Sequence, residues 1–130
     1  MKAILDTHAL LWFARGDQRL PVRIRKLIEQ SGPELYVSVA SIWEMQIKHD
    51  LGKLTLRKPP EDCISSQQST NALEILTIRP DHVYGLAALP RHHNDPFDRM
   101  LVAQALADKL TIATVDPAIT AYPAQVLAIR

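Results

Sequence analysis

Residues 95–116, DPFDRMLVAQALADKLTIATVD, contain the strongest structural pattern in the chain. Pro96 suits the first position of a helix, where its missing N–H costs no hydrogen bond. Apolar residues then recur four apart on one helical face: Phe97, Leu101 and Ala105. This spacing predicts a helix from Pro96 through Lys109, followed at once by a strand at residues 110–113. The pair is one unit of a helix–strand alternation that continues through the chain.

The remaining elements are predicted from the same kinds of pattern. Further strands are predicted at residues 2–5, 35–39, 74–78 and 125–129. Further helices are predicted at residues 7–14, from 21 to the Gly32–Pro33 stop, from 41 to about 51, at 61–72 and at 81–89. A parallel return between neighbouring strands needs a dozen or more residues of connection. The alternation therefore predicts an α/β fold with a mainly parallel central sheet flanked by helices in three α/β/α layers.

Length and composition limit the class of protein. The 130 residues suit one domain, expected to span residues 1–130. Lys and Arg total 15 against 14 for Asp and Glu, so net charge does not announce a nucleic-acid binder. Cys63 is the only cysteine, which excludes an intrachain disulfide and a thiolate zinc site. We expect a cytoplasmic protein without a signal peptide or membrane segment.

Acidic residues stand at four places where an apolar run ends or a helix begins: Asp6, Glu44, Asp98 and Asp116. In an open α/β sheet the residues that follow parallel strands gather along the carboxyl edge, where ligands bind. We therefore expect Asp6, Glu44 and Asp116 to share that edge. Asp98 is expected to join them from the start of its helix.

Each acid taken singly also has a structural interpretation, and singly that interpretation is favoured. Ser41 and Glu44 match a capping box, and Asp95 matches an N-cap. Asp98 would then complement a helix dipole, and Asp116 would cap a turn. Clustering changes the balance, because carboxylates on one rim repel each other and require a cation at neutral pH. Hard oxygen ligands select Mg²⁺ or Mn²⁺, whose natural chemistry in such a site is phosphodiester hydrolysis.

Four motifs together resemble those of PIN-domain ribonucleases, and more narrowly those of VapC-like toxins of bacterial toxin–antitoxin pairs. They are Asp6-Thr7 after the first strand, Glu44, residues 95–105 (Asp-Pro-Phe-Asp-Arg-x-Leu-x-Ala-Gln-Ala) and Thr114-x-Asp116. The resemblance covers essentially the whole chain. It implies Mg²⁺- or Mn²⁺-dependent endonucleolytic cleavage of RNA, often a transfer or ribosomal RNA, with growth arrest as the result. It also implies a co-produced antitoxin that restrains the enzyme.

The resemblance also implies roles for particular residues. The metal-binding and catalytic cluster would consist of Asp6, Glu44, Asp98 and Asp116. Thr7 and Thr114 would orient this cluster by hydrogen bonds, and Asp95 would cap the helix and support Asp98. Arg99, which follows Asp98, is the candidate contact to an RNA phosphate, with a surface ion pair as its alternative.

Two other classes of protein are alternatives to a nuclease. A receiver-type phosphoacceptor domain needs an Asp at the end of a central strand, whereas the strand at 35–39 is followed by Ala40-Ser41. A catalytically silent PIN-like module that only holds an antitoxin or another subunit is the alternative function, and the intact acids argue against it.

We expect a homodimer. Trp12 and Trp43 are predicted to lie in the core, although an exposed face would suit a dimer or antitoxin interface.

Overall fold

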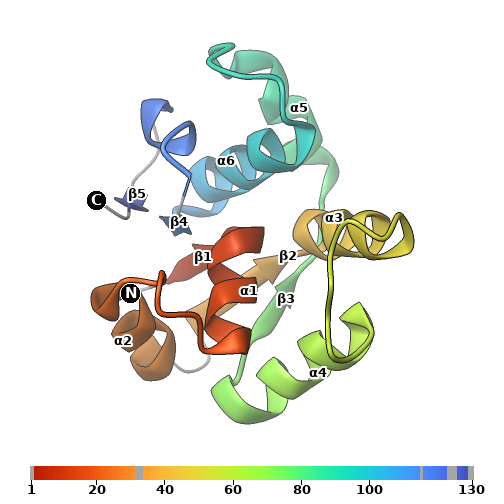
Figure 1. The fold of residues 1–130 in the computed structure, drawn as a ribbon. Coiled ribbons are helices and arrows are strands. Elements are labelled where there is room, and N and C mark those ends of the chain that lie inside the picture. Colours follow the sequence, from red (N-terminus) through yellow and green to blue (C-terminus); the bar gives the residue numbers. More distant parts are fainter. Residues whose placement is uncertain (1, 32–33, 115, 123–125, 129–130) are drawn as a thin grey trace.

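The computed structural model describes residues 2–31, 34–114, 116–122 and 126–128 (Figure 1). The strands are β1 (Ala3–Leu5), β2 (Leu35–Ser38), β3 (Glu74–Leu76), β4 (Thr111–Thr114) and β5 (Val126–Ala128). The α-helices are α1 (Thr7–Arg15), α2 (Val22–Ser31), α3 (Val39–Asp50), α4 (Pro60–Asn71), α5 (Pro80–Gly85) and α6 (Pro96–Asp108). Short 3₁₀ turns are η2 (Leu86–Ala88) and η3 (Ile119–Ala121).

The strands form one sheet with the order β3-β2-β1-β4-β5, and every neighbouring pair is parallel. Ile4 in the middle of β1 is paired with Tyr36 of β2 and Ile112 of β4. The chain places β2 and β3 on one side of β1, then returns to place β4 and β5 on the other side. The direction of strand addition therefore reverses between β1 and β4, the kind of point where open α/β sheets bind ligands. The predicted parallel α/β fold is confirmed.

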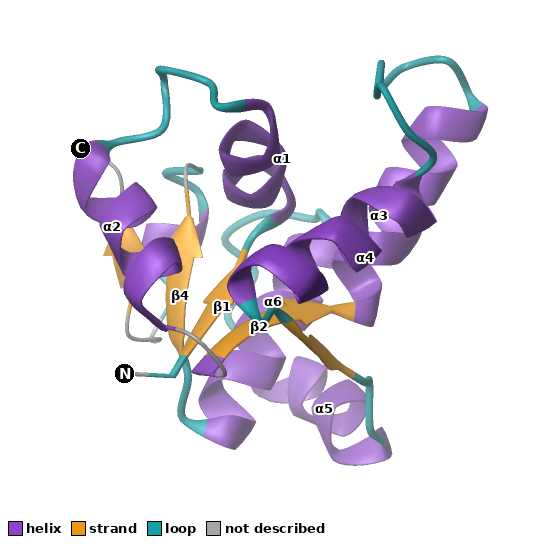
Figure 2. Cartoon of the chain, turned by 90° about the horizontal axis from the view of Figure 1, so that it is seen from below, coloured by secondary structure: helices purple, strands orange, loops and turns teal. Residues whose placement is uncertain are grey.

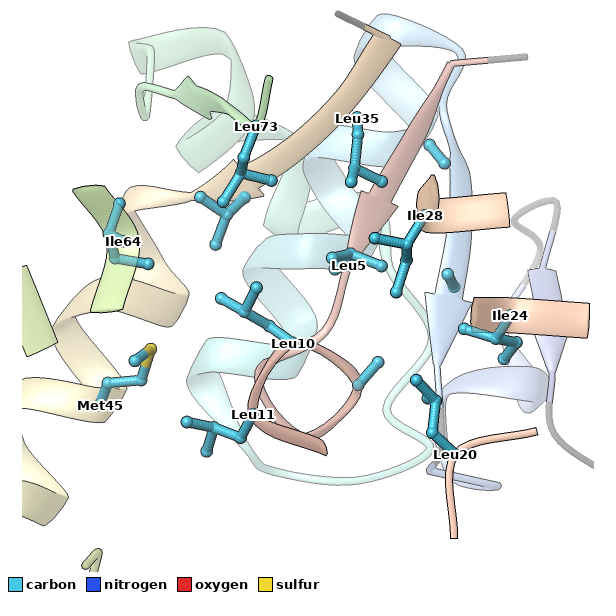
Figure 3. Close-up of a cluster of buried hydrophobic side chains, with 14 residues drawn as sticks. Leu5, Leu10, Leu11, Leu20, Ile24, Ile28, Leu35, Met45, Ile64 and Leu73 are labelled. Atoms are coloured by element: carbon cyan, nitrogen blue, oxygen red, sulfur yellow. The ribbon is translucent and has the colours of Figure 1, made fainter. Parts of the chain in front are cut away.

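Helices cover both faces of the sheet (Figure 2). Ala3 and Leu5 of β1 belong to one buried cluster and Ile4 to another, because successive side chains of a strand point to opposite faces. Side chains of the first cluster include Leu10 and Leu11 of α1, Ile24 and Ile28 of α2, Met45 of α3 and Ile64 of α4 (Figure 3). The second cluster packs α6 under the sheet through Leu101, Val102 and Ala105. The strands are thus held between two apolar layers, and their ends are left to carry polar groups.

Helix α3 begins earlier than predicted. Ser38 is its N-cap, and the Ser38 hydroxyl accepts a hydrogen bond from the Ala40 amide at 3.0 Å. The strand predicted through residue 39 therefore ends at Ser38, and the helix start predicted at Ser41 is wrong. Glu44 is the sixth helical residue, so its interpretation as part of a capping box with Ser41 is also wrong. Glu44 therefore lies in the second turn of α3 and not in the first turn, as predicted.

The other boundaries agree within a few residues. The predicted strand at 74–78 stops at Leu76, and the helix predicted at 81–89 is divided into α5 and η2. The Gly32–Pro33 stop and the two end residues of the predicted strand 125–129 lie outside the described residues. Within the described ranges, the helices are too short or too polar to cross a membrane.

The two tryptophans have different environments. Trp12 is half-buried and packs against the first cluster. The side chain of Trp43 is 61% exposed, so its predicted place in the core is wrong. Trp43 makes an edge contact with Phe97 of α6, with ring centroids 5.4 Å apart. Because α3 is buried on the side that carries Ser41, Glu44 and Met45, the intervening position of Trp43 is turned outward.

Candidate acidic active site

Asp6 lies at the carboxyl end of β1, where the strand gives way to α1. It is the N-cap of α1, and its Oδ1 accepts a hydrogen bond from the Ala9 amide at 2.7 Å. Its other carboxylate oxygen accepts a hydrogen bond from the Thr114 hydroxyl at the end of β4. Only 2% of Asp6 is exposed. The predicted acid is therefore a cap as well as a buried carboxylate at the reversal point of the sheet.

Thr114 also connects Asp6 to Asp116. The Thr114 hydroxyl accepts a hydrogen bond from the Asp116 amide at 2.9 Å, and Oδ1 of Asp116 accepts one from the Ala118 amide at 2.9 Å. The structural interpretation of Asp116 as the cap of a turn is thus correct. The same contacts bring its backbone to the end of β4, next to Asp6.

Glu44 reaches the site from the second turn of α3. It is 4% exposed, and both of its carboxylate oxygens have partners within the chain. The Thr7 hydroxyl donates to Oε1 at 2.6 Å, and the Lys48 ammonium donates to Oε2 at 2.7 Å. The support expected from Thr7 is therefore given to Glu44, whereas that of Thr114 is given to Asp6.

Asp98 is the third residue of α6, held at the helix start by Asp95. Oδ1 of Asp95 accepts hydrogen bonds from the amides of Phe97 at 2.9 Å and Asp98 at 3.1 Å, as its predicted capping role requires. Burial, followed by repulsion from Asp95, raises the pKa of Asp98 to about 7. A hydrogen bond from His93 works against this shift, and the charges of Asp116 and Glu44 add to it. Asp98 therefore lies close enough to Glu44 and Asp116 for their negative charges to repel its own.

The carboxylates of the acidic cluster are spread out and do not converge on a single point. Among the described residues, no three of its carboxylates bring ligand atoms within 4.8 Å of one another. The donors are nevertheless carboxylate oxygens, with His93 at 3.3 Å from Asp98 as the neighbouring nitrogen. Ser41, one turn before Glu44 on α3, is fully buried, and its hydroxyl has no hydrogen-bond partner. Excess negative charge, oxygen donors and an unsatisfied hydroxyl together fit a hard divalent cation.

A second cluster, which the sequence did not predict, lies between α5 and α6. Ligand atoms of Asp81, His82 and Asp108 lie within 4.8 Å of one another. Arg79 already occupies this cluster, with contacts of 2.9 Å to Asp81 and 2.6 Å to Asp108. The Arg79 amide donates to Nδ1 of His82 at 3.0 Å, which leaves Nε2 to face Asp108 at 3.3 Å. The guanidinium and the imidazole satisfy these acids, so the group ties α5 to the end of α6.

Arg99 is directed toward its own chain. Its Nη1 donates to the Pro90 carbonyl at 2.9 Å and to the Tyr122 hydroxyl at 3.1 Å. The Tyr122 hydroxyl in turn lies 2.6 Å from Nδ1 of His93, whose other ring nitrogen faces Asp98. Arg99 thus braces the loop that brings His93 to the acidic cluster.

A parallel sheet with carboxylates gathered at its reversal point defines a class of α/β proteins, and comparison identifies the family. The model of the PIN domain matches residues 3–124, and the chain belongs to the PIN-domain family. No protein with a curated description matches the sequence.

The fold is also similar to chains in solved structures. One is in VapBC2 from Rickettsia felis bound to a DNA fragment from the promoter (TM-score 0.72, 14% identity, 100% of both chains covered). Another is in DNA-bound VapBC from Salmonella typhimurium (0.71, 18% identity, 98% of each chain). A third is in a toxin–antitoxin complex from Klebsiella pneumoniae (0.65, 16% identity, 96% of this chain and 95% of that one). At these identities the likeness shows a shared fold.

Proposed function

We propose that this protein is a metal-dependent endoribonuclease and the toxin of a toxin–antitoxin pair. The supporting observation is the gathering of buried and half-buried carboxylates from the ends of β1 and β4, the second turn of α3 and the start of α6. Such a concentration of negative charge is unfavourable for folding unless it serves to hold a cation. The PIN-domain family and the fold shared with chains of VapBC complexes support the same assignment.

The chain's own residues would prepare the site. Asp6, Glu44, Asp98 and Asp116 would hold Mg²⁺ or Mn²⁺. Thr114 and the Ala9 amide fix the Asp6 carboxylate in one orientation, and Thr7 does the same for Glu44. When bound, the metal would lower the pKa of a coordinated water and stabilise negative charge on a phosphoryl oxygen. Burial of Asp6 and Glu44 keeps both carboxylates from rotating toward bulk water, so the ligands are preorganised.

The substrate is proposed to be a transfer or ribosomal RNA. Arg99 lies beside the cluster and is proposed to border the path of the RNA backbone, where its charge would attract phosphate. Its bonds to Pro90 and Tyr122 would then let it position the loop of His93 as well.

An antitoxin is proposed as the protein partner, because the similar folds occur in complexes described as VapBC or toxin–antitoxin. A groove of about 750 Å³ lies between the C-terminal half of α1, residues 55–58 and α4. Its lining combines the apolar Leu11 and Leu56 with the basic Arg15, Arg57 and Lys58. This surface suits a segment with apolar anchors and acidic side chains. Charge reversal in a double Arg57→Glu, Lys58→Glu variant should weaken binding of a co-expressed antitoxin at least tenfold, without affecting the acidic cluster.

A homodimer in the cytoplasm is also proposed. The exposed side chains of Val39 and Trp43 lie one turn apart on α3 and supply an apolar contact surface.

RNA cleavage by the purified, antitoxin-free protein tests the proposed function. Total bacterial RNA is incubated with Mg²⁺, Mn²⁺ or chelator, and wild type is compared with Asp6→Asn and Asp98→Asn. Asp50→Asn is the matched control, because Asp50 is an exposed carboxylate at the far end of α3. Cleavage by wild type and the control, only with metal, is expected.

The other outcomes separate the alternatives. Cleavage in chelator would contradict the proposal. Absence of both cleavage and metal binding would favour the catalytically silent module that holds an antitoxin or another subunit. Metal binding without cleavage would direct the search to another RNA.

A further inference from the structure

Lys48 brings an ammonium group to the acidic cluster. It follows Glu44 by one helical turn on α3, and its ammonium lies 2.7 Å from Oε2 of Glu44. The Glu44 side chain is 5% exposed, whereas that of Lys48 is 39% exposed. A Glu followed by a Lys four residues later is the favourable order on a helix. Here the pair has a further effect, because its acidic member lies at the proposed metal site.

The contacts of Glu44 differ from those of Asp98. Each oxygen of Glu44 has a donor, the Thr7 hydroxyl on one side and the Lys48 ammonium on the other. Among the described side chains, Asp98 has the His93 ring as its partner, at 3.3 Å, and it is repelled by the acids around it. Negative charge is therefore compensated on the α3 side of the cluster and uncompensated on the α6 side.

We propose that Lys48 is the resident cation of the acidic cluster and takes the place that a second divalent ion would have at Glu44. The chain then binds one divalent ion, and not two, within the cluster. A second ion on Glu44 would lie next to the ammonium, and two positive charges on one largely buried carboxylate repel each other. This inference rests on the proposed function, since it assigns the number of ions at the same site.

Metal stoichiometry provides the direct test and does not depend on catalysis. Mn²⁺ is titrated into the full-length protein by isothermal titration calorimetry, and bound Mn²⁺ is examined by electron paramagnetic resonance. Wild type is expected to bind one ion per chain and to show the hyperfine pattern of an isolated ion. Lys48→Met removes the charge but keeps an unbranched side chain, and we expect it to bind two ions per chain with a spin-coupled signal.

Two further variants separate charge from general effects on the helix. Lys48→Arg keeps a cation at the same position and should still bind one ion. Lys53→Met removes an exposed lysine just beyond α3 and should also bind one ion. Lys48→Gln replaces Lys48→Met if the latter does not fold, with the same expected gain of a second ion.

Each outcome separates this inference from the proposed function. Two ions in wild type, or one ion in both neutral Lys48 variants, would overturn the role of Lys48 and leave a metal-dependent nuclease in place. Failure of wild type to bind Mn²⁺ at all would overturn the proposed function itself, and the inference with it.

Discussion

Thr7 donates its hydroxyl hydrogen to Oε1 of Glu44 at 2.6 Å, and this bond joins the first residue of α1 to the second turn of α3. Both side chains are buried. The two helices that follow β1 and β2 are therefore connected at the acidic cluster itself. A contact of this kind stabilises the fold and fixes the orientation of a carboxylate that is proposed to bind metal.

Thr7→Val should lower the free energy of unfolding by about 1–2 kcal/mol, because one oxygen of a buried carboxylate loses its donor. Urea denaturation with chelator present measures the change without a contribution from metal. Thr7→Ser keeps the hydroxyl and should remain close to wild type. Equal stability of the valine and serine variants would show that the bond does not contribute.

Asp98 should make the metal-free protein less stable as pH rises. Its folded pKa of about 7 lies above the ordinary value of 3.8, so between these values the folded chain holds a proton that the unfolded chain has released. The free energy of unfolding therefore falls from about pH 4 to pH 7. Asp98→Asn removes this dependence and should be more stable than wild type at pH 8, by about 1–2 kcal/mol after allowance for solvent screening.

Denaturation with chelator at pH 5 and pH 8 measures the Asp98 effect. A steeper pH dependence in Asp98→Asn than in wild type would contradict it. Added Mn²⁺ should stabilise wild type at pH 8 and leave Asp98→Asn nearly unchanged, because a ligand stabilises only the state that binds it.

Asp108→Asn should reduce stability without altering metal binding. Hydrogen bonds from Arg79 hold the pKa of Asp108 below its usual range. The stability that this carboxylate provides is present above its unfolded pKa and disappears as pH falls through the folded value. At pH 7 the loss should be about 1 kcal/mol or less, since the pair is partly solvated. A fall in bound Mn²⁺ would instead show that the cluster of Asp81, His82 and Asp108 binds metal.

Trp43→Ala should change association more than folding. With 61% of the side chain exposed, its removal should cost less than about 1 kcal/mol in unfolding free energy. If Trp43 lies in the proposed dimer interface, light scattering at matched concentrations should show a shift from dimer to monomer. Leu51→Ala is the control, because this apolar side chain is similarly exposed, at 63%, just beyond α3. An unchanged dimer would exclude the Trp43 face.

Local patterns were enough to predict most of the fold. The apolar run that ends at Leu5 is short, and the helix from Pro96 has a clear periodicity, so each element could be assigned without its neighbours. The start of α3 could not be assigned in this way. Val39 is apolar and β-branched and therefore extends the strand pattern by one residue, while Ser38 and Ser41 are both suitable caps. The pairing of β2 with β3 ends at Ser38, and this makes Ser38, and not Ser41, the N-cap of α3.

Side-chain contacts account for what the sequence did not reveal about the site. Asp6 and Asp98 could be singled out because each occupies a recognisable local position. The ion pair of Arg79 with Asp108 joins residues far apart in the chain, and no short motif indicates it. Whether Trp43 is buried depends on which side of α3 packs against the rest of the fold. Its hydrophobicity alone predicted the core, whereas the side chain is exposed.

The parallel strand order has a consequence for the time at which the acidic cluster can assemble during synthesis of the chain. Asp6 leaves the ribosome before Thr114, yet its carboxylate is oriented by the Thr114 hydroxyl, 108 positions later in the chain. Strand β1 also lacks its second neighbour until β4 has been made. A nascent chain therefore carries the first acid of the cluster long before it can assemble the site. If the protein is the proposed nuclease, the ribosome that makes it is not exposed to its activity until β4 has been made.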